Sequence, residues 1–298
     1  MTDWSLTLSA PAKINLYLGV HTERDDRGYH KVDSLMAAVG LVDTVTVTPA
    51  QALTVQTIPA SDFPMQKNTA YRAAAAMAEH YGREANVCIT IEKRIPLCAG
   101  LGGPSTDAAA VIVALAESWG IDRADSALDN IARGIGADVP FFLHASPAFY
   151  VVGGDVLATE YPALPATPVV LVKPREASVS TIEAYRRFDE TPAPADKPGA
   201  IASALHSGDA EVAYALVHNN LGVISAQMEP RIQTVLDWLR SQNGTVAVNV
   251  CGSGACSFAL CDSAATAVNL AAAAQQNGWW AYATELVSDT VRIEAPKK

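Results

Sequence analysis

Residues 95–110, IPLCAGLGGPSTDAAA, constrain the fold of this chain more than any other segment. Hydrophobic patterning predicts a strand before them, over residues 87–94, and a helix after them that starts near Ser105. That helix is apolar on nearly every side from Ala108 to Ala116, which is typical of a helix buried in the middle of a domain. The glycine-rich turn that precedes it must therefore lie against a core.

The turn has the features of a phosphate-binding loop. Glycines allow the backbone to approach a phosphate closely, and the first N–H groups of a helix point at an anion with the positive end of the helix dipole. The hydroxyls of Ser105 and Thr106 are candidates for a contact to phosphate or to a phosphate-bound Mg²⁺, and Pro104 fixes φ and removes one donor. Neither GxxxxGK[ST] nor a dinucleotide GxGxxG is present. An ordinary tight turn with a helix cap is the alternative.

A lysine and an asparagine occur in residues 9–17, SAPAKINLY, on a predicted strand. Alternation places Lys13, Asn15 and Tyr17 on one face and Ile14 and Leu16 on the other. Such a pair of polar residues suits an anion or a charge-paired site, and a solvated sheet face is the alternative.

Two shorter segments add polar groups in apolar or aromatic company. Asp138 in GADVPFF either caps a turn or has a buried partner, because an unpaired buried charge is costly. Tyr29 and His30 in RGYH offer stacking and a ring hydrogen bond, as a planar base would need.

The length and the patterning predict two α+β domains. A chain of 298 residues is too long for one core, and the proline-rich residues 161–168 indicate a junction, giving domains 1–164 and 165–298. Other predicted strands are 12–20, 44–48, 87–91, 169–172, 246–250, 256–260 and 281–287, with a hairpin at 149–152 and 156–159. Predicted helices cover residues 68–82, 229–242 and 264–276, and residues 191–199 are predicted to be an exposed loop.

Composition excludes several classes of protein. Half of the residues are hydrophobic, which excludes global disorder. The net charge of −10 argues against non-specific binding of nucleic acid. Five cysteines without CxxC or metal-ligand spacing indicate reduced thiols of a cytoplasmic protein and no protein metal site. We find no signal-peptide pattern and no apolar run long enough for a membrane span, and no pattern indicates an oligomeric state.

The order of three motifs resembles a known superfamily. PAKINLYL near the start, GLGGPSTDAAA near residue 100 and Cys251-Gly252-Ser253-Gly254 near the end are similar to the motifs of the galactokinase, homoserine, mevalonate and phosphomevalonate (GHMP) kinases. DDRGYHKVDSLMAAVGLVDTVTV and GADVPFFL resemble, within it, the 4-diphosphocytidyl-2-C-methyl-D-erythritol kinases of non-mevalonate isoprenoid synthesis. The likeness covers nearly the whole chain and is weakest over residues 191–226.

The resemblance implies an architecture and a reaction. The N-terminal domain would be of the ribosomal-S5-domain-2-like type and the C-terminal domain ferredoxin-like, with the active site in the cleft between them. ATP, carrying Mg²⁺, would donate its terminal phosphate to the 2-hydroxyl of a small-molecule acceptor with a cytidine diphosphate group.

The resemblance also implies roles for residues at matching positions. Lys13 and Asp138 match the catalytic pair. Asn15, Tyr29 and His30 match substrate contacts, with the last two holding the cytosine, and Tyr185 matches an aromatic on the other side of that base. Asn68 matches a residue close to the adenine. The matching ATP loop consists of Pro96, Leu97, Cys98, Ala99, Gly100, Leu101, Gly102, Gly103, Pro104, Ser105 and Thr106.

Some positions depart from the family pattern. Glycine is usual where Pro104 stands, serine where Thr106 stands, and Met-Ser where Val250 and Cys251 stand. Pro104 stiffens the loop and gives up one donor, and Cys251 has no hydroxyl.

The expected mechanism assigns a different task to each member of the catalytic pair. Asp138 would orient the acceptor hydroxyl and take its proton, and Lys13 would neutralise charge between Asp138 and the transferring phosphate. Three alternatives remain: a homoserine or mevalonate type of kinase, a decarboxylase of the same superfamily, and a non-catalytic nucleotide-binding module. A homoserine or mevalonate type of kinase has no need of RGYH or Tyr185. The non-catalytic module is favoured if Lys13 and Asp138 lie far apart.

Overall fold

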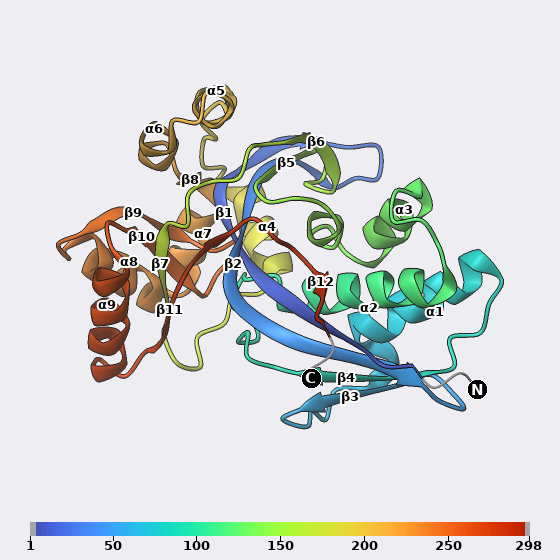
Figure 1. Ribbon diagram of the computed structural model, residues 1–298. Helices are drawn as coiled ribbons and strands as arrows, with labels where there is room; N and C mark the ends of the chain where they lie inside the picture. The colour runs from blue at the N-terminus through green and yellow to red at the C-terminus, as the bar shows by residue number, and fades with distance from the viewer. Residues whose placement is uncertain (1–3, 296–298) are drawn as a thin grey trace.

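Two long antiparallel strands form the spine of the protein. In the computed structural model, which describes residues 4–295, β1 (Leu6–Arg24) and β2 (His30–Pro49) pair along most of their length and run through the middle of the molecule (Figure 1). The predicted strands 12–20 and 44–48 lie within them. Most residues of both strands are buried, because other elements cover both faces.

The alternation predicted along β1 is broken once. The pairing register with β2 shifts between Asn15 and Tyr17, as at a β-bulge. Tyr17 consequently packs in the same apolar cluster as Ile14 and Leu16. The prediction that Tyr17 shares a face with Lys13 and Asn15 is therefore wrong.

The N-terminal lobe extends this sheet and covers it with helices. The added strands are β3 (Thr54–Ile58), β4 (Val87–Glu92), β5 (Ala148–Val151) and β6 (Val156–Glu160). The helices are η1 (Met65–Lys67), α1 (Thr69–Tyr81), α2 (Gly103–Trp119), α3 (Ser126–Ile135) and η2 (Pro140–Leu143). The predicted hairpin is confirmed as β5 and β6, and the predicted helix 68–82 as α1.

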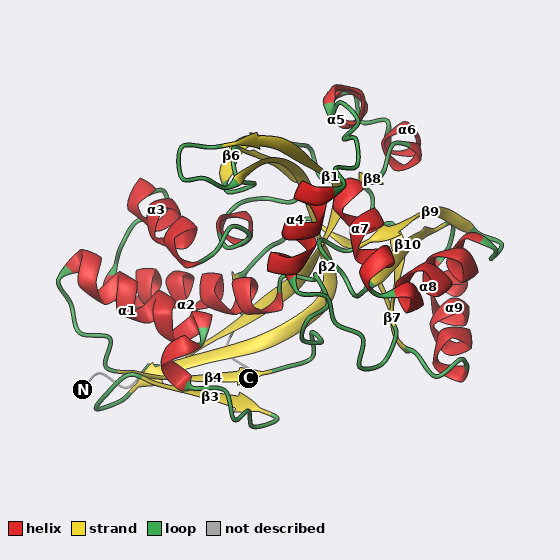
Figure 2. Ribbon diagram, turned by 180° about the vertical axis from the view of Figure 1, so that it is seen from behind, coloured by secondary structure: helices red, strands yellow, loops and turns green. Residues whose placement is uncertain are grey.

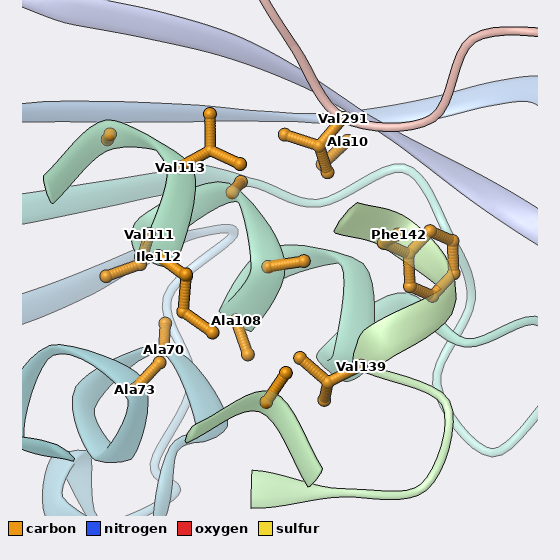
Figure 3. Packing of buried hydrophobic residues seen from close by; sticks show 14 of the residues in the cluster. Ala10, Ala70, Ala73, Ala108, Val111, Ile112, Val113, Val139, Phe142 and Val291 are labelled. Carbon is orange, nitrogen blue, oxygen red and sulfur yellow. The ribbon is translucent and has the colours of Figure 1, made fainter. Parts of the chain in front are cut away.

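Helix α2 forms the centre of this lobe, as its composition predicts. Every residue from Ala108 to Ala116 is buried, and Figure 3 shows its side chains among those of α1, β1 and the segment around Phe142. The helix begins at Gly103, two residues before the predicted Ser105, because proline is well accommodated in the first turn of a helix.

The C-terminal lobe is a four-stranded antiparallel sheet with the order β11-β7-β10-β9. Its strands are β7 (Pro168–Lys173), β9 (Thr245–Val250), β10 (Ser257–Cys261) and β11 (Trp280–Val287). Its helices are α4 (Thr181–Glu190), α5 (Gly199–His206), α6 (Ala210–Ala215), α7 (Asn220–Met228), α8 (Pro230–Arg240) and α9 (Ala264–Gln276). The predicted exposed loop 191–199 connects α4 to α5.

Both faces of the C-terminal sheet are covered, as β7 shows. Val170 and Val172 pack with residues of α8 and α9, whereas Val169 and Leu171 face a second cluster that includes residues of β1, α5 and α6. Figure 2 shows α8 and α9 beside this sheet.

The two lobes share hydrogen bonds along the spine. β11 pairs with β7 on one side and with β2 on the other, through Leu286 and Val287, and the short strand β12 (Arg292–Ile293) pairs with β1. β8 (His218–Asn219) also pairs with β1. The predicted junction 161–168 lies between β6 and β7, and the division into 1–164 and 165–298 stays a prediction. No helix within residues 4–295 is long and apolar enough to span a bilayer.

Candidate active site

Lys13 and Asp138, 125 positions apart in the sequence, meet in the structure. The Nζ of Lys13 lies 3.4 Å from Oδ2 of Asp138. The lysine is almost fully buried, whereas the aspartate side chain keeps 37% of its surface exposed. The distance is that of an ion pair without a tight hydrogen bond, so the carboxylate remains accessible to a ligand.

Asn15 holds the lysine and a glycine loop together. Its Oδ1 accepts hydrogen bonds from Lys13 Nζ at 2.8 Å and from the backbone N–H of Gly252 at 3.0 Å, and its Nδ2 donates to Ser34 Oγ at 2.9 Å. The amide therefore has one N–H left for a ligand. Lys13 and Asn15 are buried, so the alternative of a solvated sheet face does not apply.

The glycine-rich loop packs closely on these residues. Gly100 and Gly102 have φ of +74°, which favours glycine. A Cβ built at Gly102 would lie 3.0 Å from Cγ of Lys13 and 2.9 Å from the ring of Phe142, and one at Gly100 would overlap the carbonyl oxygen of Cys251. Any side chain at either position would push apart the three segments that form the site.

The free amides of the loop are fewer than its sequence suggests. The N–H groups of Ser105 and Thr106 donate to the carbonyl oxygen of Gly102. Within residues 4–295, the amides of Gly100, Leu101 and Gly102 donate to no other residue. The donors left for a phosphate therefore lie in the loop before α2.

The glycine loop near residue 252 closes the other side of the site. The N–H groups of Ala255 and Cys256 donate to the carbonyl oxygens of Cys98 and Ala99, at 3.2 Å each, so the two glycine loops are joined by backbone hydrogen bonds. Cys251 is completely buried, and burial raises the pKa of its thiol. It contributes packing and backbone groups to the site.

The predicted ATP residues do not all face the same space. Pro96 and the residues from Cys98 to Ser105 line the cleft described below. Leu97 is largely exposed, and Thr106 is buried behind the loop with no hydrogen-bond partner for its Oγ1 among the described residues. Asn68 caps α1 by accepting from Ala70 N–H at 2.9 Å and does not line the cleft.

A buried ionic cluster that the sequence analysis missed lies behind the loop. Lys93 Nζ contacts carboxylate oxygens of both Asp43 and Asp107, the latter at 2.6 Å. Asp43 also accepts from the backbone N–H groups of Arg94 and Ile95. The cluster therefore ties the end of β4, where the loop begins, to the start of α2, where it ends. In the sequence, Asp43 and Asp107 each stand next to an apolar run, and this pattern could have pointed to a buried carboxylate at each position.

Burial and charge oppose each other in this cluster. Burial raises the pKa of Asp107 to about 7, with Lys93 opposing the rise and Asp43 adding to it. Burial also disfavours the charged form of Lys93, but the two carboxylates outweigh it and raise the pKa of this lysine.

All these elements border one large cleft. Its volume is about 1200 Å³, above the range of roughly 300–1,000 Å³ typical of a pocket for one small ligand. The cationic side chains that line it are Lys13, Arg24, Arg27, Arg72, Arg133 and Arg186, and the carboxylates are Asp138, Asp155 and Asp189. Six cations against three carboxylates make the cleft positive in a chain of net charge −10, which favours polyanionic ligands. Of these arginines, only Arg27 belongs to a motif predicted from the sequence, RGYH, and it was given no role there.

Part of the lining of the cleft is aromatic. The ring of His30 stacks on that of Tyr185 with 5.4 Å between centroids, and both residues line the cleft. His30 Nδ1 lies 2.7 Å from the backbone oxygen of His21, so it donates its proton there. Nε2 is buried, has no hydrogen-bond partner among the described residues and lies 3.2 Å from Asp189 Oδ1.

Two tyrosines of this region differ in exposure. Tyr29 lines the cleft and is 66% exposed, with the guanidinium of Arg27 over its ring. Burial raises the pKa of Tyr185 to about 12, and the nearby charge of Asp138 adds to the rise. Because His30 and Tyr185 stack directly on each other, a base would lie against the outer face of one ring and not between these two.

Known proteins resemble the whole chain. The model of the GHMP kinases N terminal domain matches residues 68–146, and that of the GHMP kinases C terminal matches residues 201–278. The 4-diphosphocytidyl-2-C-methyl-D-erythritol kinase of Mycolicibacterium gilvum is 37% identical over 89% of this chain and 85% of its own length. The protein of that name from Mycobacterium tuberculosis H37Rv is 35% identical over 90% and 86%.

Solved structures agree with these relatives. A crystal structure of a 4-(cytidine 5'-diphospho)-2C-methyl-D-erythritol kinase superposes with a TM-score of 0.77 at 33% identity, covering 94% of this chain and 98% of that one. A homoserine kinase from Cytophaga hutchinsonii has a TM-score of 0.74 at 19% identity, covering 97% of each chain, which shows the shared fold alone.

Proposed function

The chain belongs to the 4-diphosphocytidyl-2-C-methyl-D-erythritol kinases within the GHMP kinases, and from this premise we propose that it transfers the terminal phosphate of ATP to the 2-hydroxyl of that acceptor. The observation that carries the proposal is the contact of Lys13 with Asp138 inside a cleft that is lined by the glycine loops and by the His30–Tyr185 stack. The cleft has room and positive charge for two anionic substrates.

The catalytic pair acts on the acceptor hydroxyl. Asp138 orients this hydroxyl and takes its proton as the O–P bond forms. Lys13, held in place by Asn15, neutralises charge between the carboxylate and the phosphate. Phosphoryl transfer depends mainly on such positioning and charge stabilisation, since little covalent chemistry is left to the protein.

The glycine loop binds the donor. The unpaired amides of residues 100–102 and the hydroxyl of Ser105 face the cleft and supply donors to the phosphate oxygens. Within residues 4–295 no three His, Cys, Asp or Glu side chains are grouped to hold a metal ion. This lining fits a Mg²⁺ that would be bound mostly by phosphate oxygens and water, and Ser105 and Asp138 are the residues of the cleft that would hold it. When bound, Mg²⁺ supplies charge neutralisation on the phosphates.

The aromatic part of the lining binds the cytosine. We place the base between the exposed ring of Tyr29 and the outer face of Tyr185, with His30 and its neighbour Asp189 at the edge of the base. All five cysteines are free, in keeping with a reducing compartment, and we place the reaction in the cytoplasm.

Replacing Tyr185 by alanine tests the base site. We expect the KM for the cytidine acceptor to rise about tenfold, because an aromatic stacking contact contributes about 0.5–1.5 kcal/mol beyond its buried area. The KM for ATP should change less than twofold. Steady-state kinetics with each substrate varied in turn measures both constants. Tyr282→Ala, a partly exposed tyrosine of β11 away from the cleft, is the matched control. Equal rises in both KM values would contradict a site specific for the base.

One experiment tests the reaction against its alternatives. ADP release is measured with 4-diphosphocytidyl-2-C-methyl-D-erythritol, homoserine and mevalonate as competing acceptors, and CO₂ release is followed with mevalonate diphosphate. We expect turnover only with the cytidine compound. Turnover of homoserine or mevalonate at a comparable rate, or CO₂ release, would overturn the proposal. No ADP release with any acceptor would favour a non-catalytic module, against which the Lys13–Asp138 contact already argues.

A further inference from the structure

The turn that carries Tyr29 is folded by local hydrogen bonds, among them those from the N–H groups of Asp25 and Gly28 to the carbonyl oxygens of Tyr29 and Asp25, at 2.7 and 2.9 Å. Asp25 folds it by accepting from the N–H groups of Arg27 and Tyr29, each at 3.0 Å, and Gly28 takes a φ of +83°. Tyr29 nevertheless projects with two thirds of its surface exposed. Local hydrogen bonds do not fix a turn against the rest of the protein, so an exposed aromatic on a short turn is a poor platform for a base unless a further contact restricts the turn.

Arg27 supplies that restriction from within the turn. Its two terminal nitrogens contact the two carboxylate oxygens of Asp155, at 2.7 and 3.2 Å, and its Nε donates to Asp25 at 2.8 Å. A bidentate pair of this kind fixes orientation as well as distance. The carbon at the centre of the guanidinium lies 5.6 Å from the centre of the Tyr29 ring, within the range of a cation–π contact.

Asp155 is a firm anchor. It lies at the end of the β5–β6 turn, 3% exposed, and Arg133 approaches the same carboxylate at 3.5 Å. Burial would raise the pKa of Asp155, but the hydrogen bonds from Arg27 outweigh it and lower the pKa below its usual value. The carboxylate therefore stays ionised over the neutral range.

The turn that carries this anchor is held in an unfavourable conformation. Val152 has a φ of +69°, which is strained for a β-branched residue. Its carbonyl oxygen accepts from Val32 N–H at 2.7 Å, so the turn is pinned to β2 next to His30. A Cβ at Gly153 would lie 2.8 Å from a terminal nitrogen of Arg27, so only glycine lets the guanidinium in.

We propose that Arg27 and Asp155 form a clasp that positions Tyr29 for binding the cytosine of the acceptor. The inference rests on the proposed function and adds two positioning residues to it. Arg27 acts through Tyr29 and not as a phosphate ligand, because both of its terminal nitrogens and its Nε already contact carboxylates. It covers one face of the tyrosine ring, which leaves the other face for the base.

The test is a double-mutant cycle with Arg27→Met and Asp155→Asn. Each single variant should raise the KM for the acceptor about tenfold and weaken binding of cytidine 5'-diphosphate, measured by calorimetry without ATP, by a similar factor. The KM for ATP and kcat should stay within twofold. Because the two side chains act through one contact, the double variant should bind cytidine 5'-diphosphate no less tightly than the single variant that binds it less well. The affinity of Arg27→Lys for cytidine 5'-diphosphate should lie between those of Arg27→Met and wild type, since an ammonium cannot bind both carboxylate oxygens in the same way.

The controls separate the clasp from the function on which it rests. Arg231→Ala removes an exposed arginine of α8 that pairs with a carboxylate outside the cleft. It should change neither the KM for the acceptor nor the affinity for cytidine 5'-diphosphate. If wild type binds cytidine 5'-diphosphate and both single variants bind it within twofold of wild type, the clasp is wrong and the proposed function stands. Additive losses in the double variant would also overturn the clasp. If wild type itself fails to bind cytidine 5'-diphosphate, the proposed base site fails.

Discussion

An enzyme with Asp138 replaced by asparagine is expected to turn over about 10³-fold more slowly than wild type, within the roughly 10²–10⁴ that a general base contributes. Asparagine keeps the shape of the side chain and can still hydrogen-bond the acceptor hydroxyl, but it cannot take the proton. The loss should therefore appear in kcat, while the KM for ATP changes little. Single-turnover phosphoryl transfer, followed by quenched flow, measures the chemical step directly.

Two controls make the loss of activity specific. Asp237→Asn changes an exposed aspartate of α8 that pairs with Arg240 outside the cleft, and its activity should equal that of wild type. The thermal unfolding of the Asp138 variant should also be measured, because Lys13 stays buried when its partner loses charge. A folded Asp138→Asn enzyme with near-normal kcat would show that another group takes the proton.

The pairing of Lys13 with Asp138 was predictable only from the order of the motifs. Each residue taken alone had an ordinary alternative, a solvated sheet face for one and a turn cap for the other. Their contact depends on two glycines that allow close packing, Gly102 against Lys13 and Gly100 against the carbonyl of Cys251. Local sequence patterns do not reveal how closely segments that are far apart in the chain approach each other.

Capping and loop geometry also modify the predicted ATP site. The side-chain oxygen of Asn68 caps α1, and the placement of this residue near the adenine stays a prediction. Thr106 was grouped with Ser105 because the two are adjacent in the sequence. On a helix, adjacent residues point in directions about 100° apart, and here only Ser105 reaches the cleft. Such differences follow from where the helix begins, and helix boundaries are poorly determined by sequence patterns.

The fold was predicted best where burial is complete. The all-apolar stretch of α2 and the short continuous apolar run of β7 each identify their element. The helices of residues 181–228 were not predicted, because their apolar residues are few or occur in short runs, and all of these helices except α4 begin where the resemblance is weakest. The return of β11 and β12 to the N-terminal sheet is a long-range pairing that no local pattern specifies.

Loss of the buried cation of the Lys93 cluster is expected to have the largest effect on stability. Lys93→Met leaves Asp43 and Asp107 buried without a counter-ion, and breaking a buried ion pair in this way costs about 3–5 kcal/mol of the free energy of unfolding. The loss should be measured by urea unfolding at pH 8 and at pH 5. Lys67→Met, an exposed lysine of η1, is the matched control and should lose little.

The loss in Lys93→Met should be smaller at pH 5, and the sign follows from Asp107. Its pKa in the folded protein is raised to about 7, above the value of about 3.9 for an unfolded aspartate, so the folded state holds a proton in this window that the unfolded state lacks. The stability contributed by this group is thus present at low pH and declines as pH rises through 7. At pH 5 Asp107 is already neutral, so removing Lys93 exposes less repulsion than at pH 8.

The double variant Lys93→Met with Asp107→Asn should recover part of the loss at pH 8, because it removes one unpaired carboxylate. A loss that is equal at both pH values and unaffected by Asp107→Asn would show that Lys93 acts through packing, and the loop would then be held by hydrogen bonds to Asp43 alone.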